Sequence, residues 1–179
     1  MQINLHMCIF FCTFAVKILH ARMRESARCL IYTRATRESR IRKNKPLYTM
    51  SNTIVHIIEG NPNAGKTITA WLIYLQLLQN GQVEFFYLFK DGLYEIPANS
   101  EEPNREIATY NNEYGKPIPY DFCAVIKIAA SRVAIFSAGD NEVAINRAFD
   151  WLKKISPDAF VGCSRSNGHS YARQTLLSL

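Results

Sequence analysis

The fold expected of this chain follows from one stretch, Thr53-Ile54-Val55-His56-Ile57-Ile58-Glu59-Gly60-Asn61-Pro62-Asn63-Ala64-Gly65-Lys66-Thr67. Its first seven residues are rich in β-branched side chains and have the length of a strand. The last eight match the pattern G-x-x-x-x-G-K-[ST] at every fixed position. Apolar residues then recur at the spacing of a helix, and Asn80-Gly81 supplies a stop. The stretch therefore predicts a strand, a glycine-rich loop and a helix. The apolar face expected of that helix consists of Ile68, Trp71, Leu72, Leu75 and Leu78.

The glycine-rich loop has the chemistry of a polyphosphate site. Two glycines let the backbone wrap closely around phosphates with its N–H groups pointing inward. Lys66 can reach the β- and γ-phosphates, the Thr67 hydroxyl can hold a Mg²⁺ ion, and the helix N-terminus favours negative charge. The alternative is a plain glycine-rich turn with a solvated lysine, and the flanking strand and helix argue against it. The expected cofactor-binding residues are Gly60, Asn61, Pro62, Asn63, Ala64, Gly65, Lys66 and Thr67.

From Thr53 to about Phe89 the chain resembles the P-loop NTPases, and it is most similar to their small nucleotide and metabolite kinases. The resemblance implies an α/β three-layer sandwich with a mainly parallel sheet. It also implies binding of ATP or GTP with Mg²⁺, and phosphoryl chemistry. The chain stops where small P-loop kinases usually continue through one further strand, so a missing C-terminal edge strand is part of the expectation.

The charge of the chain is divided unevenly. Residues 1–49 contain ten basic and two acidic residues, whereas residues 50–179 carry a net charge of −2. The domain thus lacks the electrostatic footprint of nucleic-acid binding. The apolar stretch at residues 3–16 is too short for an ordinary transmembrane helix and has no preceding basic region. We expect a nucleotide-binding domain at 50–179 and a disordered or non-native leader at 1–49, with a targeting sequence or a basic interaction arm as alternatives.

The five cysteines form no C-x-x-C pair, so neither a zinc site nor a disulfide framework is expected. Cys123 and Cys163 lie within apolar runs, which is typical of buried small hydrophobic side chains. A reducing, cytoplasmic setting is the corresponding expectation.

After the first helix, residues 83–89 are expected to form a strand that completes a βαβ unit. Residues 122–128 and 132–136 are expected to form an antiparallel hairpin, because a parallel crossover needs a dozen or more residues. A helix with Ile145, Ala148, Phe149 and Leu152 on its apolar face should follow, and then a strand at 159–163.

Three carboxylates are candidates for the metal side of the site. Asp140 is preferred because it follows the end of the 132–136 strand, where doubly wound sheets place their ligands. It could equally serve as the N-cap of the next helix. Asp121 is ranked second, because it begins its strand and is expected at the opposite edge of the sheet. Glu59 is the weakest of the three. The expected metal ligands are therefore Thr67 and Asp140.

Arg165 follows the last strand, at the position where small P-loop kinases carry the arginines of a lid. The resemblance implies a catalytic role for Arg165 beside Lys66, and an exposed loop arginine is the alternative. The resemblance also implies a phosphate-acceptor site in the polar segment 90–120, and an ordinary solvated loop is the alternative. Its candidate lining residues are Asp91, Tyr94, Arg105, Tyr110, Tyr114 and Tyr120.

The function expected from these features is that of a small, kinase-like phosphotransferase that uses Mg-ATP and an unidentified small-molecule acceptor. The alternative is an ATP- or GTP-binding regulatory switch without an acceptor. The chain has no intact N-K-x-D or D-x-x-G motif, which disfavours a GTPase. No hydrophobic strand ends in paired acidic residues, which disfavours a motor ATPase.

Overall fold

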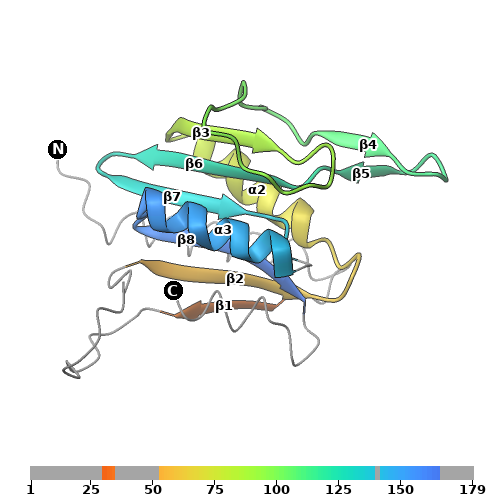
Figure 1. Cartoon of the computed structure of the whole chain (residues 1–179), viewed down its shortest axis with the longest axis horizontal. Coiled ribbons are helices and arrows are strands. Elements are labelled where there is room, and N and C mark those ends of the chain that lie inside the picture. Colours follow the sequence, from red (N-terminus) through yellow and green to blue (C-terminus); the bar gives the residue numbers. More distant parts are fainter. Residues whose placement is uncertain (1–29, 35–52, 140–141, 166–179) are drawn as a thin grey trace.

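The computed structural model describes residues 30–34, 53–139 and 142–165, and they form one large sheet, a small two-stranded sheet and two helices (Figure 1). The strands of the large sheet, in spatial order, are β1 (Leu30–Arg34), β2 (Ile54–Gly60), β8 (Ala159–Arg165), β7 (Ser131–Phe136), β6 (Phe122–Ile128) and β3 (Gln82–Leu88). The small sheet pairs β4 (Thr109–Asn111) with β5 (Pro117–Pro119), and the helices are α2 (Lys66–Leu78) and α3 (Glu142–Ile155).

The prediction of a mainly parallel P-loop sandwich is wrong. Strands β2, β8 and β7 pair in parallel, but the other three neighbouring pairs of the large sheet are antiparallel. The described strands also contain more residues than the two helices, so the protein is mainly β. The expected hairpin is confirmed as β6–β7, and its two-residue connection, Ala129-Ala130, is too short for a parallel crossover.

Strand β3 is not a neighbour of β2, although α2 alone connects them along the chain. Strands β8, β7 and β6 lie between the two, and β3 closes the far edge of the sheet against β6. The edge beside β2 is occupied by β1, which belongs to the segment interpreted above as a leader. Local sequence order therefore did not predict which strands are adjacent.

The two helices lie on opposite faces of the large sheet (Figure 1). The face under α2 is aromatic, and the ring centroids of Trp71 and Phe122 are 4.3 Å apart. The face under α3 includes the buried residues Phe136 and Phe160. Strands β2 and β6 are buried on both faces, which explains their nearly continuous apolar sequences.

The apolar face predicted for α2 is only partly correct. Trp71 is fully buried, but Ile68 and Leu72 are 42% and 36% exposed, and Tyr74 is buried in their place. This helix is apolar around most of its circumference, so periodicity alone did not determine its buried side. In the amphipathic α3 the predicted residues Ile145, Ala148 and Leu152 are buried, and Phe149 is half-buried.

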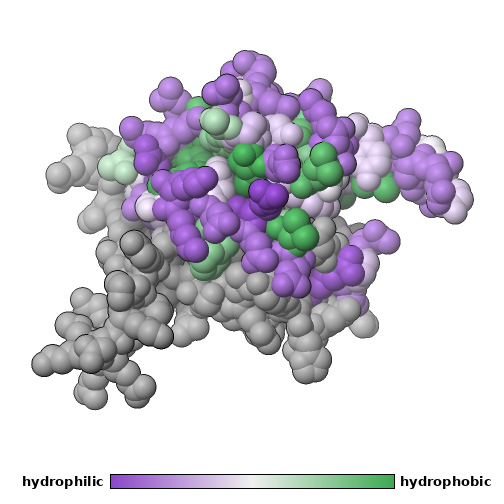
Figure 2. Space-filling model, in the orientation of Figure 1, coloured by the Kyte–Doolittle hydropathy of each residue, from purple (hydrophilic) through white to green (hydrophobic). Residues whose placement is uncertain are grey.

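Strands β4 and β5 form a hairpin that projects from the rest of the protein (Figures 1 and 2). The Asn112 side chain accepts hydrogen bonds from the backbone N–H groups of Tyr114 and Lys116, at 3.0 and 2.9 Å, and so fixes its turn. The hydrophobic areas on the face shown in Figure 2 are small and separate. Neither helix of the described ranges is long and apolar enough to span a membrane.

The two cysteines that the structure describes, Cys123 and Cys163, are buried and not disulfide-bonded, as predicted. Burial raises the pKa of the Cys123 thiol, and the nearby Glu101 carboxylate raises it further. The thiol form is therefore favoured, and Cys123 is a packing residue rather than a nucleophile.

Tyr74 contributes a fully buried hydroxyl that has no hydrogen-bond partner among the described residues. An unsatisfied buried polar group costs about 1–3 kcal/mol. We expect Tyr74→Phe to increase the free energy of unfolding by about 1 kcal/mol or more. Urea unfolding at neutral pH measures this, and a clear loss of stability would show that the hydroxyl is satisfied.

The same residue predicts an alkaline dependence of stability. Burial raises the pKa of Tyr74 to about 12, against a smaller opposing effect of Arg105. An unfolded tyrosine loses its proton near pH 10, so the folded state binds more protons between about pH 10 and 12. The resulting stabilisation is present below that window and is lost as the pH rises through it. Tyr74→Phe should flatten this decline.

Candidate functional site

The candidate site lies at the edge of the large sheet that runs across the strand ends. Along this edge β2, β8, β7 and β3 end and β6 begins. The register places Gly60 of β2 opposite Arg165 of β8, and Phe136 of β7 opposite Gly162 of β8. Because β6 runs antiparallel to both of its neighbours, its first residue, Phe122, lies opposite Leu88 near the end of β3. Residues that follow β2, β7 and β3 are thereby brought to the same edge as residues that precede β6.

The loop between β2 and α2 has the backbone conformation that its glycine permits. Gly65 has φ 83°, in the left-handed region where a side chain would be strained. Asn63 also has a positive φ, and the Ala64 N–H donates to the Asn61 carbonyl at 3.1 Å. Helix α2 begins directly after Gly65, with no side-chain cap and no acidic residue in its first turn. This helix terminus is electrostatically suited to an anion.

Lys66 lies within this loop region rather than in open solvent. Its side chain is buried, and its Nζ donates a hydrogen bond to the Asn61 carbonyl at 3.1 Å. Lys66 also lines the cavity described below. The ammonium group is thus held over the loop at the N-terminus of α2, where it adds positive charge to that of the helix.

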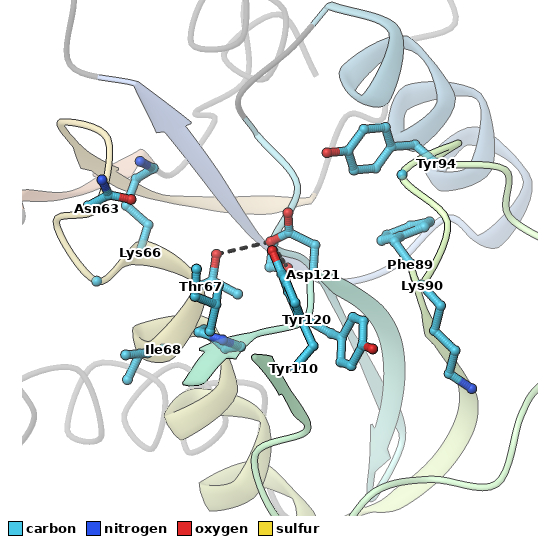
Figure 3. A pocket seen from close by; sticks show the side chains of 15 residues that line it. Asn63, Lys66, Thr67, Ile68, Phe89, Lys90, Tyr94, Tyr110, Tyr120 and Asp121 are labelled. Atoms are coloured by element: carbon cyan, nitrogen blue, oxygen red, sulfur yellow. Dashed lines mark hydrogen bonds between the residues drawn. The ribbon is translucent and has the colours of Figure 1, made fainter. Parts of the chain in front are cut away.

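Thr67, Asp121 and Ser137 form a hydrogen-bonded group at the sheet edge (Figure 3). The Thr67 hydroxyl donates to Asp121 Oδ1 at 3.0 Å, and the Ser137 hydroxyl donates to the same oxygen at 2.9 Å. Ser137 Oγ in turn accepts a hydrogen bond from the Phe122 N–H at 2.8 Å. The carboxylate is therefore positioned beside the threonine of the loop motif by a buried serine that directly follows β7.

The expected position of Asp121 was wrong. It was placed at the opposite edge because it begins its strand, yet it lies against Thr67 because that strand runs antiparallel to β7. The predicted hairpin already contained this signal, since the start of one hairpin strand lies beside the end of the other. Asp140, the preferred metal ligand, lies outside the described residues.

The remaining charged candidates lie at the same edge. Glu59 is buried in β2, opposite Ser164 of β8 in the register. Arg165 is the last residue of β8 and is half-buried opposite Gly60, where the loop starts. The position of Arg165 beside the loop is compatible with a role toward a loop-bound anion.

A cavity of about 520 Å³ opens at this edge of the sheet. Its volume is within the usual range for small-molecule sites. Three of the tyrosines predicted to line an acceptor site do line it, whereas Tyr114, Asp91 and Arg105 do not. The lining consists of Asn63, Gly65, Lys66, Thr67, Ile68, Phe89, Lys90, Gly92, Tyr94, Tyr110, Ile118, Pro119, Tyr120, Asp121 and Ser137.

Several of these lining residues could not be recognised from the sequence. Ser137 follows a strand end, which could have marked it, but nothing local distinguishes it from an ordinary buried serine. Phe89 and Lys90 follow the end of β3, and only the adjacency of β3 and β6 brings them to the cavity. Figure 3 shows them on the far side of Asp121 from the loop.

The metal-binding potential of the site is limited to a few oxygen atoms. The described residues contain no group of three or more His, Cys, Asp or Glu side chains that could hold a metal ion. A magnesium ion needs few protein ligands, because water and substrate phosphates usually complete its coordination. The Thr67 hydroxyl and the Asp121 carboxylate are hard oxygen donors of the suitable kind.

Searches of protein families, curated proteins and solved structures found no match to this chain. The resemblance to P-loop NTPases therefore depends on the loop pattern and its flanking elements.

Ser137→Ala tests how Asp121 is positioned. It removes the hydroxyl that bonds Asp121 and leaves the Phe122 N–H without that acceptor, at a cost of about 1–3 kcal/mol. If Thr67 and Asp121 hold the Mg²⁺ ion of a nucleotide, we expect a higher Mg²⁺ requirement for its binding in addition to this loss of stability. Ser100→Ala is the matched control, because its hydroxyl also accepts a backbone N–H, that of Phe86 in β3, which three strands separate from β2. An equal Mg²⁺ requirement in both variants would contradict the positioning role.

Proposed function

We propose that this chain binds the triphosphate of Mg·ATP at residues Gly60–Thr67 and transfers the γ-phosphoryl group to a small acceptor in the adjoining cavity. The observation that carries the proposal is the hydrogen bond between Thr67 and Asp121 at the N-terminus of α2, in a cavity that Lys66 also lines. This contact adds a carboxylate, which the loop pattern alone does not contain, to the metal side of the site.

The residues fit a magnesium-bound triphosphate in charge and in donor type. The loop offers backbone N–H groups and Lys66 to phosphate oxygens, and the first turn of α2 contains no carboxylate that would repel them. Bound Mg²⁺ would neutralise charge that develops between the β- and γ-phosphates. Thr67 and Asp121 would hold this ion, Lys66 would bind the phosphate oxygens, and Arg165 is the second candidate cation.

The cavity extends well beyond the loop, which is compatible with phosphoryl transfer to a second molecule. A regulatory switch needs room for its nucleotide only, and turnover that an acceptor stimulates distinguishes the two functions. Here Phe89, Tyr94 and Tyr110 form walls at a distance from the loop residues, as Figure 3 shows for the labelled side chains. The space is suited to an acceptor or to the remainder of a nucleotide. A cytoplasmic setting, where ATP and Mg²⁺ are abundant, is part of the proposal.

A transfer assay on the full chain tests the proposal. The protein is incubated with Mg²⁺, with ATP or GTP, and with a panel of small hydroxyl- and phosphate-bearing acceptors, while release of the nucleoside diphosphate is followed. Turnover that an acceptor stimulates supports the phosphotransferase. Slow hydrolysis that no acceptor changes favours the switch, and absence of nucleotide binding contradicts both.

A further inference from the structure

The cavity has two chemically different ends. Lys66, Thr67, Asp121 and Ser137 lie at the loop end, which is polar. The other lining side chains are largely aromatic or aliphatic, and they include Phe89, Tyr94, Tyr110 and Tyr120. A ligand with a charged group at one end and an apolar group at the other would match this division.

The aromatic side chains come in two contacting pairs. The ring centroids of Tyr110 and Tyr120 are 4.8 Å apart, and those of Phe89 and Tyr94 are 5.4 Å apart. The first pair belongs to the base of the β4–β5 hairpin, and the second follows the end of β3. Figure 3 shows the two pairs as separate groups, with Asp121 next to the Tyr110–Tyr120 pair.

Backbone hydrogen bonds hold both pairs at the site. The Trp71 indole N–H donates to the Tyr120 carbonyl at 2.9 Å, which ties the hairpin base to α2. The Phe89 N–H donates to the Asp121 carbonyl at 2.8 Å, which ties the end of β3 to the start of β6. The aromatic walls are therefore anchored to the same elements that carry Thr67 and Asp121.

Few charged groups line the aromatic end. Asp121 is the only carboxylate in the described cavity lining. Lys90 is the charged lining residue on the side away from the loop (Figure 3). The Lys90 ammonium lies 3.6 Å from a Glu101 carboxylate oxygen. The hydroxyls of Tyr94, Tyr110 and Tyr120 remain as polar groups of the aromatic end, beside ring faces that are apolar. A flat heteroaromatic ring offers an apolar face for stacking and polar atoms at its rim for such hydroxyls.

We infer that the aromatic end binds a planar heteroaromatic ring of the nucleobase kind by stacking on the tyrosine side chains. The inference rests on the proposed function, because it takes the loop end as the phosphate end of the cavity. The ring could belong to the bound triphosphate itself or to a second molecule that accepts the phosphoryl group. Both sources present the same chemistry to Tyr110 and Tyr120.

Separate probes can address the two ends. Inorganic tripolyphosphate with Mg²⁺ reports on the loop end alone, and the free nucleosides adenosine, guanosine, cytidine and uridine report on the aromatic end alone. Calorimetric titration of the full chain should show binding of both kinds of probe. Base stacking on an aromatic side chain is worth about 1–3 kcal/mol, so Tyr110→Ala should weaken the best nucleoside by about tenfold. Tripolyphosphate binding should be unchanged.

Tyr114→Ala is the matched control, because Tyr114 lies on the same hairpin, is 77% exposed and does not line the cavity. It should change neither binding constant. If Mg·ATP displaces the bound nucleoside, the aromatic end binds the ring of the triphosphate itself. A nucleoside that still binds with Mg·ATP present shows that the ring is that of a second molecule, and either result supports the inference.

The outcomes that overturn the inference differ from those that overturn the proposed function. Binding of tripolyphosphate without binding of any nucleoside would overturn the inference and leave the proposed function intact. Nucleoside binding that Tyr110→Ala does not weaken, or glucose binding that it does weaken, would also overturn the inference. Failure of tripolyphosphate to bind would overturn the proposed function instead.

Discussion

Under the proposed function, Lys66→Ala is expected to remove most of the stabilisation by Mg·ATP. A ligand at 100 times its dissociation constant adds about 2.7 kcal/mol to apparent stability. Removal of a group that stabilises charge in the transition state also typically lowers turnover by about 10²–10³-fold. Thermal unfolding with and without Mg·ATP, together with the turnover assay, measures both effects.

The control for this substitution is Lys127→Ala. Lys127 is an exposed lysine near the end of β6, at the edge of the sheet opposite to the loop. It should leave the nucleotide-induced stabilisation unchanged. An unaltered melting shift in Lys66→Ala would contradict the role assigned to Lys66, provided that the variant is folded.

Asp121→Asn should raise the Mg²⁺ concentration required for turnover by about 10–100-fold, the usual effect of weakening the surroundings of a metal site. The asparagine carbonyl can still accept hydrogen bonds from the Thr67 and Ser137 hydroxyls, so the fold should be preserved. A neutral amide is, however, a poorer partner than a carboxylate for a hard cation. Turnover measured against Mg²⁺ concentration gives the result.

Asp91→Asn removes the same charge from an exposed residue that does not line the cavity, and it serves as the matched control. A Mg²⁺ dependence of Asp121→Asn that coincides with that of the control would exclude Asp121 from the metal side. The search for a metal partner would then pass to Glu59 and Asp140.

The parts of the structure that local sequence determines were predictable. The β2–loop–α2 order follows from a β-branched run, a glycine in the left-handed region and a helical apolar pattern. The β6–β7 hairpin follows from the length of its connection, which leaves no room for a crossover. Burial of Cys123 and Cys163 follows from their apolar surroundings.

The arrangement of the sheet was not predictable in this way, because strand order is decided by packing between distant segments. The segment after α2 returns parallel to β2 in the same sheet, as a βαβ unit requires, but three strands separate β3 from β2. A continuous apolar pattern in α2 could not show that Ile68 and Leu72 face outward while Tyr74 faces the sheet.

The loop residues of the candidate site were predictable from a motif, whereas the residues that other strands bring to the site were not. The loop residues follow from their pattern, and three of the candidate lining residues, Tyr94, Tyr110 and Tyr120, line the cavity. Asp121 was ranked second because ligands were expected where strands end, whereas β6, which is antiparallel to β7, begins at this edge. Ser137 could not be recognised, because its role depends on a hydrogen bond to a residue sixteen positions away.

We propose that the loop at Gly60–Thr67 and the carboxylate of Asp121 together hold a magnesium-bound nucleoside triphosphate. Calorimetric titration of the full chain with a non-hydrolysable ATP analogue, with Mg²⁺ and then with a chelator in its place, measures this binding. We expect one saturable site per chain whose affinity falls without Mg²⁺, in Lys66→Ala and in Asp121→Asn. Absence of binding, or binding that none of these three changes weakens, would contradict it.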